Sequence, residues 1–428
     1  MLKRWYSILL LLLVGSVSTV IAQVGQSPYT IQGIGEVQQD LFIHQIQKGG
    51  IGLSNANPWQ LNIANPALLP VNSLTVFEVG AIGERRTISN GGLSQSNGGF
   101  NLNYLAFGFP VIPSVWTTAI SLTPYSNVQY NVNVRENIGG TNSLIDKSFI
   151  GSGGINQVYW SNGLAINKRL LFGLKIAYNF GSIIDETIIN QISIPVSDTT
   201  AHSASFRTAY YDRLRVGDFR FRGGLAYLHP LTKTVSLNLG VTYDFATNLK
   251  STSYTRIERR DQDDLIQASD TIRNDIDGNI RIPRTIGLGI SLNRGTQWLI
   301  GADVYLTNWE NYENFDGQNE NLQNSMMLNI GAEWVPDFFS VTNYLSRMAY
   351  RVGFNYENTP FTINGNQINE FGINFGVSLP VSSVSSINIG MNYGQRGFAG
   401  NEVINEEFYQ FTIGATFNDR WFIRRKYD

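Results

Sequence analysis

Cysteine is absent from this chain of 428 residues, and charged side chains make up only 15% of it. Without cysteine the chain has no disulfides and no thiolate-bound metal. The histidines, His44, His202 and His229, lie far apart and lack the helical spacing of a zinc hydrolase site. We therefore expect no cofactor. A net charge of −2 also excludes the basic surface that nucleic-acid binding needs.

Long apolar runs are also missing, except at the N-terminus. There Lys3 and Arg4 precede an apolar stretch at residues 8–14, and a run of small residues ends at Ala22. This order predicts a cleavable signal peptide over residues 1–22. No later run approaches the ~20 apolar residues of a membrane-spanning helix. We therefore expect an exported chain without a helical anchor.

Apolar and polar residues alternate in segment after segment. In "VSLNLGVTYDF", residues 235–245, odd positions are apolar or aromatic and even positions are small or polar. "FGLKIAYNFG", residues 172–181, repeats the pattern. These runs approach about ten residues, which a tilted strand needs to cross a bilayer, whereas strands of soluble proteins average about five or six. One face of each strand is expected to meet lipid and the other a polar interior.

About fourteen such segments predict an all-β fold, a closed antiparallel transmembrane β-barrel over residues 74–418. The predicted strands lie near residues 74–87, 99–111, 114–124, 154–166, 169–181, 218–228, 233–246, 283–293, 296–307, 325–336, 346–358, 367–379, 384–395 and 407–418. Short turns alternate with long polar connections such as 182–217 and 247–282, which is typical of tight periplasmic turns and longer outer loops. Only the connection at 337–345 is long for a turn.

Aromatic side chains gather near the predicted strand ends. The tryptophans among them are Trp160, Trp298, Trp309 and Trp334. This position fits a belt at the membrane–water interface. Taken singly, each is equally well an ordinary core or loop residue.

Two stretches fit no regular strand. Residues 49–69 read "GGIGLSNANPWQLNIANPALL", and residues 121–130 read "SLTPYSNVQY", with Pro124 inside a predicted strand. Proline cannot donate to a sheet ladder, so it belongs at an edge, an end or a bulge. With the strand count, these stretches resemble the FadL-like outer-membrane proteins. That family of long-chain fatty acid transporters includes the PorV-like secretion components of Bacteroidetes.

The resemblance implies that residues 23–73 form a plug inside the barrel. Its Asn-Pro-Ala element corresponds here to Asn65, Pro66 and Ala67, with Asn62 close by. In a confined lumen, glycine permits tight turns, asparagine satisfies freed backbone groups and proline fixes a bend. For Asn65 alone the alternative is an ordinary capped turn before a short helix.

The resemblance also implies a kinked third strand that opens the wall sideways. The opening corresponds here to Pro124, Tyr125 and Ser126, and an apolar ligand would leave through it into lipid. Alternation resumes after the proline, as it would in an interrupted strand. The alternative is that the strand simply ends at Thr123.

Charged residues are expected to point into the lumen, because a charge facing lipid costs roughly 2–4 kcal/mol at mid-depth. The inward positions carry Lys175, Arg220, Arg222, Asp244, Asp303, Glu333, Arg351 and Glu357. An arginine among them offers bidentate binding of a carboxylate head group. The alternative is a structural network of ion pairs, and this interior is more polar than an acyl-chain conduit should be.

Two further stretches are rich in charge. Residues 255–283 mix both signs without the residue order of an EF-hand, so we expect a solvated outer loop rather than a calcium site. Residues 419–428 form a basic tail that is expected in the periplasm. No GxSxG or paired-acid motif supports catalysis.

These observations predict an integral protein of the bacterial outer membrane, surrounded by lipid. The leading hypothesis is transport of small hydrophobic or amphipathic molecules, of fatty-acid type, through a plugged barrel with lateral release. The alternative is a PorV-like barrel whose outer loops bind a protein partner during secretion or surface assembly. Neither hypothesis involves an enzyme.

Overall fold

The computed structural model describes residues 25–137, 143–193, 202–203, 206–363, 365–382, 384–397 and 404–419. The predicted signal peptide and all of the basic tail beyond Asp419 lie outside these residues. Within them, no helix combines the length and the apolar character needed to cross a membrane.

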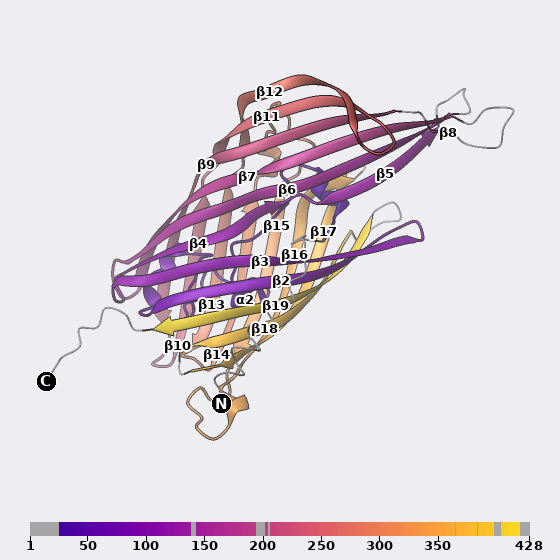
Figure 1. Cartoon of the computed structure of the whole chain (residues 1–428). Helices are drawn as coiled ribbons and strands as arrows, with labels where there is room; N and C mark the ends of the chain where they lie inside the picture. Colours follow the sequence, from indigo (N-terminus) through magenta and orange to yellow (C-terminus); the bar gives the residue numbers. More distant parts are fainter. Residues whose placement is uncertain are drawn as a thin grey trace, which may run out of the picture.

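The wall is one closed antiparallel sheet with 14 strand positions, as predicted (Figure 1). Its strands are β2 (Thr75–Asn90), β3 (Leu93–Ile112), β4 (Trp116–Asn127), β5 (Tyr130–Asn137), β6 (Ser143–Ala165), β7 (Leu170–Ser193), β9 (Arg207–Pro230), β10 (Val235–Asp244), β11 (Thr247–Arg260), β12 (Ile266–Ile282), β13 (Thr285–Arg294), β14 (Trp298–Thr307), β15 (Ser325–Trp334), β16 (Ala349–Ile363), β17 (Asn366–Pro380), β18 (Ser386–Arg396) and β19 (Asn405–Asp419). The ring closes where β19 pairs with β2. Three positions are each divided into two strands, namely β4 with β5, β10 with β11, and β12 with β13.

Residues 25–74 lie inside the barrel, and we call them the luminal segment. It contains η1 (Pro28–Ile31), β1 (Glu36–Val37), α2 (Ile43–Ile46) and η2 (Pro66–Val71). The connections contain β8 (His202–Ser203), η3 (Trp309–Asn311) and α3 (Tyr344–Arg347). Phe42, Leu53 and Leu69 are fully buried, and the segment contacts strands around the ring.

Outward and inward faces alternate as the sequence indicates. On β7, Phe172, Leu174 and Tyr178 are exposed on the outer surface, whereas Lys175 and Asn179 are buried inside. Such an apolar outer surface is suited to lipid. The closed sheet also pairs backbone groups between neighbouring strands, which a barrel in hydrocarbon requires. The end with the short turns, where β2 begins and β19 ends, is the periplasmic end by the usual asymmetry of such barrels.

The expected aromatic belt is correct in part. Trp160 and Trp334 are exposed on the outer surface, as interfacial side chains should be. Trp309 is buried in η3 and lines an internal cavity, so its assignment to the belt is wrong. It belongs to the 308–324 connection that packs against β12, where Arg281 and Glu313 exchange backbone hydrogen bonds.

Two predicted outer loops are largely strands. β7 pairs with β9 beyond residue 182, and β11 and β12 form a hairpin against the upper half of β9. Their sequences lack clean alternation because polar side chains such as Ser251, Ser253 and Thr255 occupy the buried positions of β11. With β5 and the upper half of β6 they form what we call the raised panel, which stands above the rest of the rim (Figure 1). In the described residues, no three potential metal ligands come together, there or elsewhere.

Beside the raised panel the ladder of the wall stops halfway. β3 pairs with β4 up to Leu105 and Leu122, and above that level its described pairing is with β2 alone. The register of β4 against β6 shifts at Pro124, which cannot donate a hydrogen bond. We call this break the seam. It lies between residues 93–104 and residues 123–137.

Glycines permit the bend of the wall at the seam. Gly153 and Gly154 of β6 have φ values of +100° and +147°, which side chains with a Cβ rarely adopt. A Cβ on Gly154 would also lie 2.3 Å from the carbonyl oxygen of Ser126. The sequence therefore allows β4 and β5 to follow β6 away from β3.

Inward glycines of the wall leave the space that the luminal segment occupies. A Cβ on Gly240 would lie 1.8 Å from the carbonyl oxygen of Leu53.

We expect Gly240→Ala to destabilise the folded barrel by about 1–3 kcal/mol, the usual cost of overpacking. The measurement is the temperature at which the folded, fast-migrating band is lost in gel electrophoresis. Gly223→Ala is the matched control because no atom lies within 4 Å of its Cβ position. Equal effects of the two substitutions would contradict this packing.

Candidate functional site

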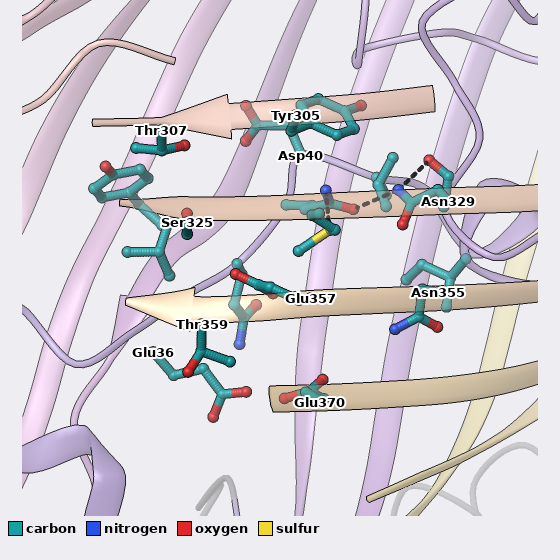
Figure 2. Close-up of a pocket in the computed structure, with 18 of the residues that line it drawn as sticks. Glu36, Asp40, Tyr305, Thr307, Ser325, Asn329, Asn355, Glu357, Thr359 and Glu370 are labelled. Carbon is teal, nitrogen blue, oxygen red and sulfur yellow. Dashed lines mark hydrogen bonds between the residues drawn. The ribbon is translucent and has the colours of Figure 1, made fainter. Parts of the chain in front are cut away.

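A cavity of about 320 Å³ lies between the luminal segment and the wall. Figure 2 shows Glu36 and Asp40 of the luminal segment together with wall residues such as Tyr305, Asn329 and Glu357. The volume is at the lower end of the range for small-molecule sites. Its lining combines carboxylates, amides and arginines with a smaller number of aromatic and aliphatic side chains.

The predicted Asn-Pro-Ala element holds the luminal segment together and ties it to the wall. Asn62 Nδ2 donates to the carbonyl oxygens of Gly52 and Asn55, at 2.7 and 3.0 Å. Asn65 Oδ1 accepts from the Ala67 amide at 3.0 Å, which caps η2.

Asn65 also reaches the wall, while Pro66 begins η2. Asn65 Nδ2 donates to the carbonyl oxygens of Leu53 and Leu225, at 2.8 and 3.1 Å. Pro66 lies against Gly173 of β7, where a Cβ would lie 2.3 Å from the Pro66 carbonyl carbon. The capped-turn alternative for Asn65 is therefore part of the arrangement rather than a competitor to it.

One group of lumen charges meets at Asp40. The Lys175 ammonium and the Arg222 guanidinium lie 2.6 and 3.0 Å from Asp40 Oδ2. Arg222 also donates to both carboxylate oxygens of Asp244, at 2.6 and 2.9 Å. Burial alone would raise the pKa of the Asp40 carboxyl, but Lys175 and Arg222 outweigh this effect and lower that pKa to about 2.

A second group lies nearer the periplasmic end. Glu333 accepts from Arg351 at 2.7 Å and from Lys48, which is fully buried, at 3.2 Å. Arg351 also donates to Gln47 Oε1 at 2.8 Å and to Asn388 Oδ1 at 2.9 Å. The Arg351 guanidinium thus has three acceptors within the protein, namely Glu333, Gln47 and Asn388.

Asp303 has a structural role of a different kind. Its Oδ2 accepts the backbone amides of Gly52 and Leu53, at 2.6 and 2.8 Å. It therefore binds backbone donors of the luminal segment rather than a side-chain cation.

A third group of buried ion pairs, which was not predicted from the sequence, lies beside the seam. Arg396 binds Glu36 and Glu370, each at 2.6 Å, and Arg86 binds Glu84 at 2.8 Å and Glu406 at 2.9 Å. The signal was present, because these wall residues occupy inward positions of their alternating strands. Glu36 belongs to the luminal segment, so no strand pattern could have placed it there.

Arg220 differs from the other arginines at the cavity. Its guanidinium carbon lies 4.3 Å from the centroid of the Tyr125 ring, and its Nε has no hydrogen-bond partner. Among the residues that the structure describes, no carboxylate forms an ion pair with it, although it is only 9% exposed. Arg220 is therefore the luminal arginine best placed to receive an anionic group.

The residues predicted for the lateral opening lie at the seam. Pro124 does not end the strand, because β4 continues to Asn127 and the interruption follows at residues 128 and 129. Ser126 is buried and pairs with Val37 of β1, while the backbone carbonyl of Tyr125 accepts from the Gln38 amide at 2.9 Å. A strand need not stop at proline, since a register shift accommodates the missing donor.

The luminal segment closes the seam from inside. The amide of Ser27 donates to the Gln129 carbonyl at 2.8 Å, and the Gln129 amide donates to Thr30 Oγ1 at 3.2 Å. On the other side of the seam, Gln26 donates its amide to Asn97 Oδ1 at 2.8 Å. Backbone groups of residues 125–129, which lack a partner in β3, are thus partly satisfied by residues 26–38, whereas β3 is contacted through the Asn97 side chain.

The sequence of the whole chain, residues 1–428, matches the model of the BamG family. This chain belongs to the BamG family. A comparison with curated proteins finds no match for this BamG-family chain.

Solved structures confirm the FadL-like fold predicted from the sequence. The chain is similar to the toluene transporter TodX of Pseudomonas putida, with 15% identity and a TM-score of 0.56, over 89% of this chain and 98% of TodX. It is also similar to a Pseudomonas aeruginosa FadL homologue, with 13% identity and a TM-score of 0.57, over 87% and 96% of the two chains. At these identities the likeness establishes the fold of this BamG-family protein and nothing further.

We expect Asp40→Asn to loosen the luminal segment, because it leaves Lys175 and Arg222 buried without their shared carboxylate. The expected loss of folding free energy is about 3–5 kcal/mol, as for other broken buried pairs. The measurement is thermal unfolding of the purified protein together with protease cleavage between residues 25 and 74. Asp146→Asn is the control, since Asp146 pairs with Arg135 in an exposed position. If both substitutions left stability and cleavage unchanged, the Asp40 cluster would not hold the segment.

Proposed function

We propose that this BamG-family protein is an outer-membrane transport protein that moves small hydrophobic or amphipathic molecules. The observation that carries the proposal is that the cavity borders the seam on both sides. Its lining includes Gly99, Asn101 and Asn103 of β3, and Tyr125 of β4, with Gly35 to Gln38 of the luminal segment between them. A molecule held in the cavity is therefore separated from the seam by one short stretch of chain.

Lateral release would require residues 26–38 to move away from the seam. This stretch is joined to β4 by a ladder of 2 residues, β1, and by a small number of further hydrogen bonds. Each hydrogen bond contributes only about 0.5–1.5 kcal/mol net. Opening would also have to break the ion pairs of Glu36 with Arg396 and Arg86. The barrel can remain folded, because the rest of the luminal segment is held by the Asp40 and Glu333 clusters.

A fatty-acid-like substrate would place its carboxylate at Arg220. Arg222 and Arg351 are already occupied by protein carboxylates and amides, which leaves Arg220 from the three candidates of the sequence analysis. A guanidinium stacked on an aromatic ring keeps its edge free for a bidentate contact. The two remaining arginines then belong to the structural network.

A disulfide that ties the luminal segment to β4 at the seam should block release. Because Gln38 donates to Tyr125, the adjacent Val37–Ser126 pair is the non-hydrogen-bonded type, with Cα atoms about 4.5 Å apart and suited to a disulfide. We expect Val37→Cys with Ser126→Cys to abolish uptake of labelled fatty acid by cells that lack the wild-type gene. A reductant should restore uptake.

The control for this test is Thr252→Cys with Asp277→Cys, a cross-strand pair of the β11–β12 hairpin away from the seam. The chain has no native cysteine, so no competing disulfide can form. Uptake that persists through an oxidised Val37–Ser126 bridge would refute lateral release. Uptake that is unchanged when the gene is deleted would refute transport itself.

Substitution of Arg220 separates carboxylate recognition from passage. We expect Arg220→Gln to lower uptake of labelled fatty acid at least about tenfold, the effect of losing a charge-assisted hydrogen bond. Uptake of labelled toluene, which has no carboxylate, should not change. A parallel loss for both compounds would instead assign Arg220 a structural role.

A second candidate function, binding of a protein partner in secretion or surface assembly, is favoured by the free sheet edges at the seam. The upper half of β3 and the outer edge of β5 lack a described strand partner on their facing sides, and extended peptides add to such edges. Crosslinking from residues 182–193 and 247–260 of the raised panel tests it. Recovery of a stoichiometric protein partner supports this function, whereas co-purified small hydrophobic molecules without a protein support transport.

A further inference from the structure

The connection between β15 and β16 exposes apolar side chains that the transport proposal does not use. It is the turn that is unusually long for the periplasmic end, and it includes α3. Phe339 is 80% exposed, Val341 93% and Leu345 62%. Large apolar residues of other turns at this end, such as Ile112, Val115 and Leu231, are only 44–51% exposed, and Ile166 is a single residue of its turn. Here the exposed apolar residues are concentrated in one element, residues 335–348, which we call the periplasmic knob.

Hydrogen bonds within the periplasmic knob fix its shape. Asp337 receives the Phe339 amide on its side chain at 3.0 Å, and its own amide donates to the Ser346 carbonyl at 2.8 Å. Asn343 Oδ1 accepts from the Leu345 amide at 3.0 Å and caps α3. The exposed side chains are therefore presented by an ordered backbone, which lowers the entropy that binding would cost.

The periplasmic knob is also fastened to the barrel at its base. The Tyr344 hydroxyl donates to the Pro380 carbonyl at 3.2 Å, and the Tyr350 hydroxyl donates to the Leu345 carbonyl at 3.1 Å. The Phe338 ring stacks on Trp59 of the luminal segment, with centroids 6.0 Å apart. Phe338 thus packs against the luminal segment, while Phe339 lies edge-on to Phe338, with ring centroids 5.2 Å apart, and stays exposed.

The position of the periplasmic knob favours a protein over lipid as its partner. Trp334 and Tyr350, with ring centroids 5.9 Å apart, mark the rim of the wall at the two ends of the knob. Figure 1 shows the connection, in orange, projecting beyond this end of the barrel rather than lying along the outer wall. Apolar side chains exposed on an ordered turn mark a protein or membrane contact, and the projection of this turn beyond the end of the barrel favours a protein.

We propose that the periplasmic knob is a docking site for a periplasmic protein, which receives Phe339 and Val341 in an apolar pocket. Two or three anchoring side chains of this kind carry most of the binding energy of small interfaces. The side chain of Asp337 is engaged within the turn, and Arg347 lies over the Tyr344 ring at 5.3 Å. The partner surface is therefore expected to be apolar rather than charged. This proposal does not depend on transport.

The test is photo-crosslinking in intact cells from a benzophenone side chain at Thr342, an exposed position next to the anchor Val341. We expect one adduct with a discrete periplasmic protein, identified by mass spectrometry, and at least a tenfold loss of that adduct when Phe339→Ser is added. A benzophenone at Leu231 is the control and should give no such adduct. Folding of each variant is verified by the heat-dependent shift of its band in gel electrophoresis.

Three results would overturn the proposal. The first is the absence of any adduct from Thr342, and the second is an adduct with another copy of this chain alone. The third concerns lipid. A fluorophore on Val341→Cys, in a chain without other cysteines, should emit as it does in water when the purified protein is placed in vesicles of phosphatidylethanolamine and phosphatidylglycerol. A strongly blue-shifted emission would show that the knob inserts into the membrane instead.

Discussion

The constraint that shapes this protein is the need to pair every backbone hydrogen-bonding group that faces lipid. In hydrocarbon an unpaired peptide group costs several kcal/mol, so the wall must close on itself, and β19 returns to β2 to do so. The seam is the place where this closure is incomplete. Residues 26–38 supply part of the missing pairing from inside, so the luminal segment completes the wall as well as filling the lumen. The proposed lateral release would act on this same stretch of the luminal segment.

Charge holds the luminal segment in place. Asp40 and Lys48 of the segment meet partners from β7, β9 and β15, and Glu36 meets Arg396 of β18. Because these groups are buried, each carboxylate or ammonium would be costly without its partner. The polar lumen therefore reflects how the segment is bound. Arg220, stacked on Tyr125 at the cavity, is the exception, because no carboxylate of the described residues forms an ion pair with it.

Much of the fold could be read from the sequence because lipid imposes a simple rule on alternate residues. The residue type at positions such as Phe172 and Lys175 predicts whether the side chain faces lipid or the lumen. Repetition of this pattern along the chain predicts fourteen strands. The raised panel was predicted as loops because polar residues such as Ser251 and Thr255 fill its buried positions, so apolar alternation is absent. Trp309 was assigned to the rim because a strand end and a buried turn look alike in sequence.

The site was harder to read, for a different reason. The inward positions of Arg222, Asp303 and Arg351 follow from strand parity, but each also has a partner in the luminal segment, which has no periodicity. Pro124 predicted an interruption of the third strand but not its position. The register of β4 against β6 shifts at Pro124, and β4 continues to Asn127. Which arginine remains without a carboxylate depends on these pairings, so only the folded structure distinguishes Arg220.

Hydrogen–deuterium exchange of the protein in lipid nanodiscs tests the central claim most directly, because it reports the backbone pairing at the seam. If the luminal segment completes the wall, amides of residues 26–38 and 125–129 will exchange more than about a hundredfold more slowly than in an unstructured peptide. Exchange of residues 26–38 at the unstructured rate, with the remaining wall protected, would contradict the account.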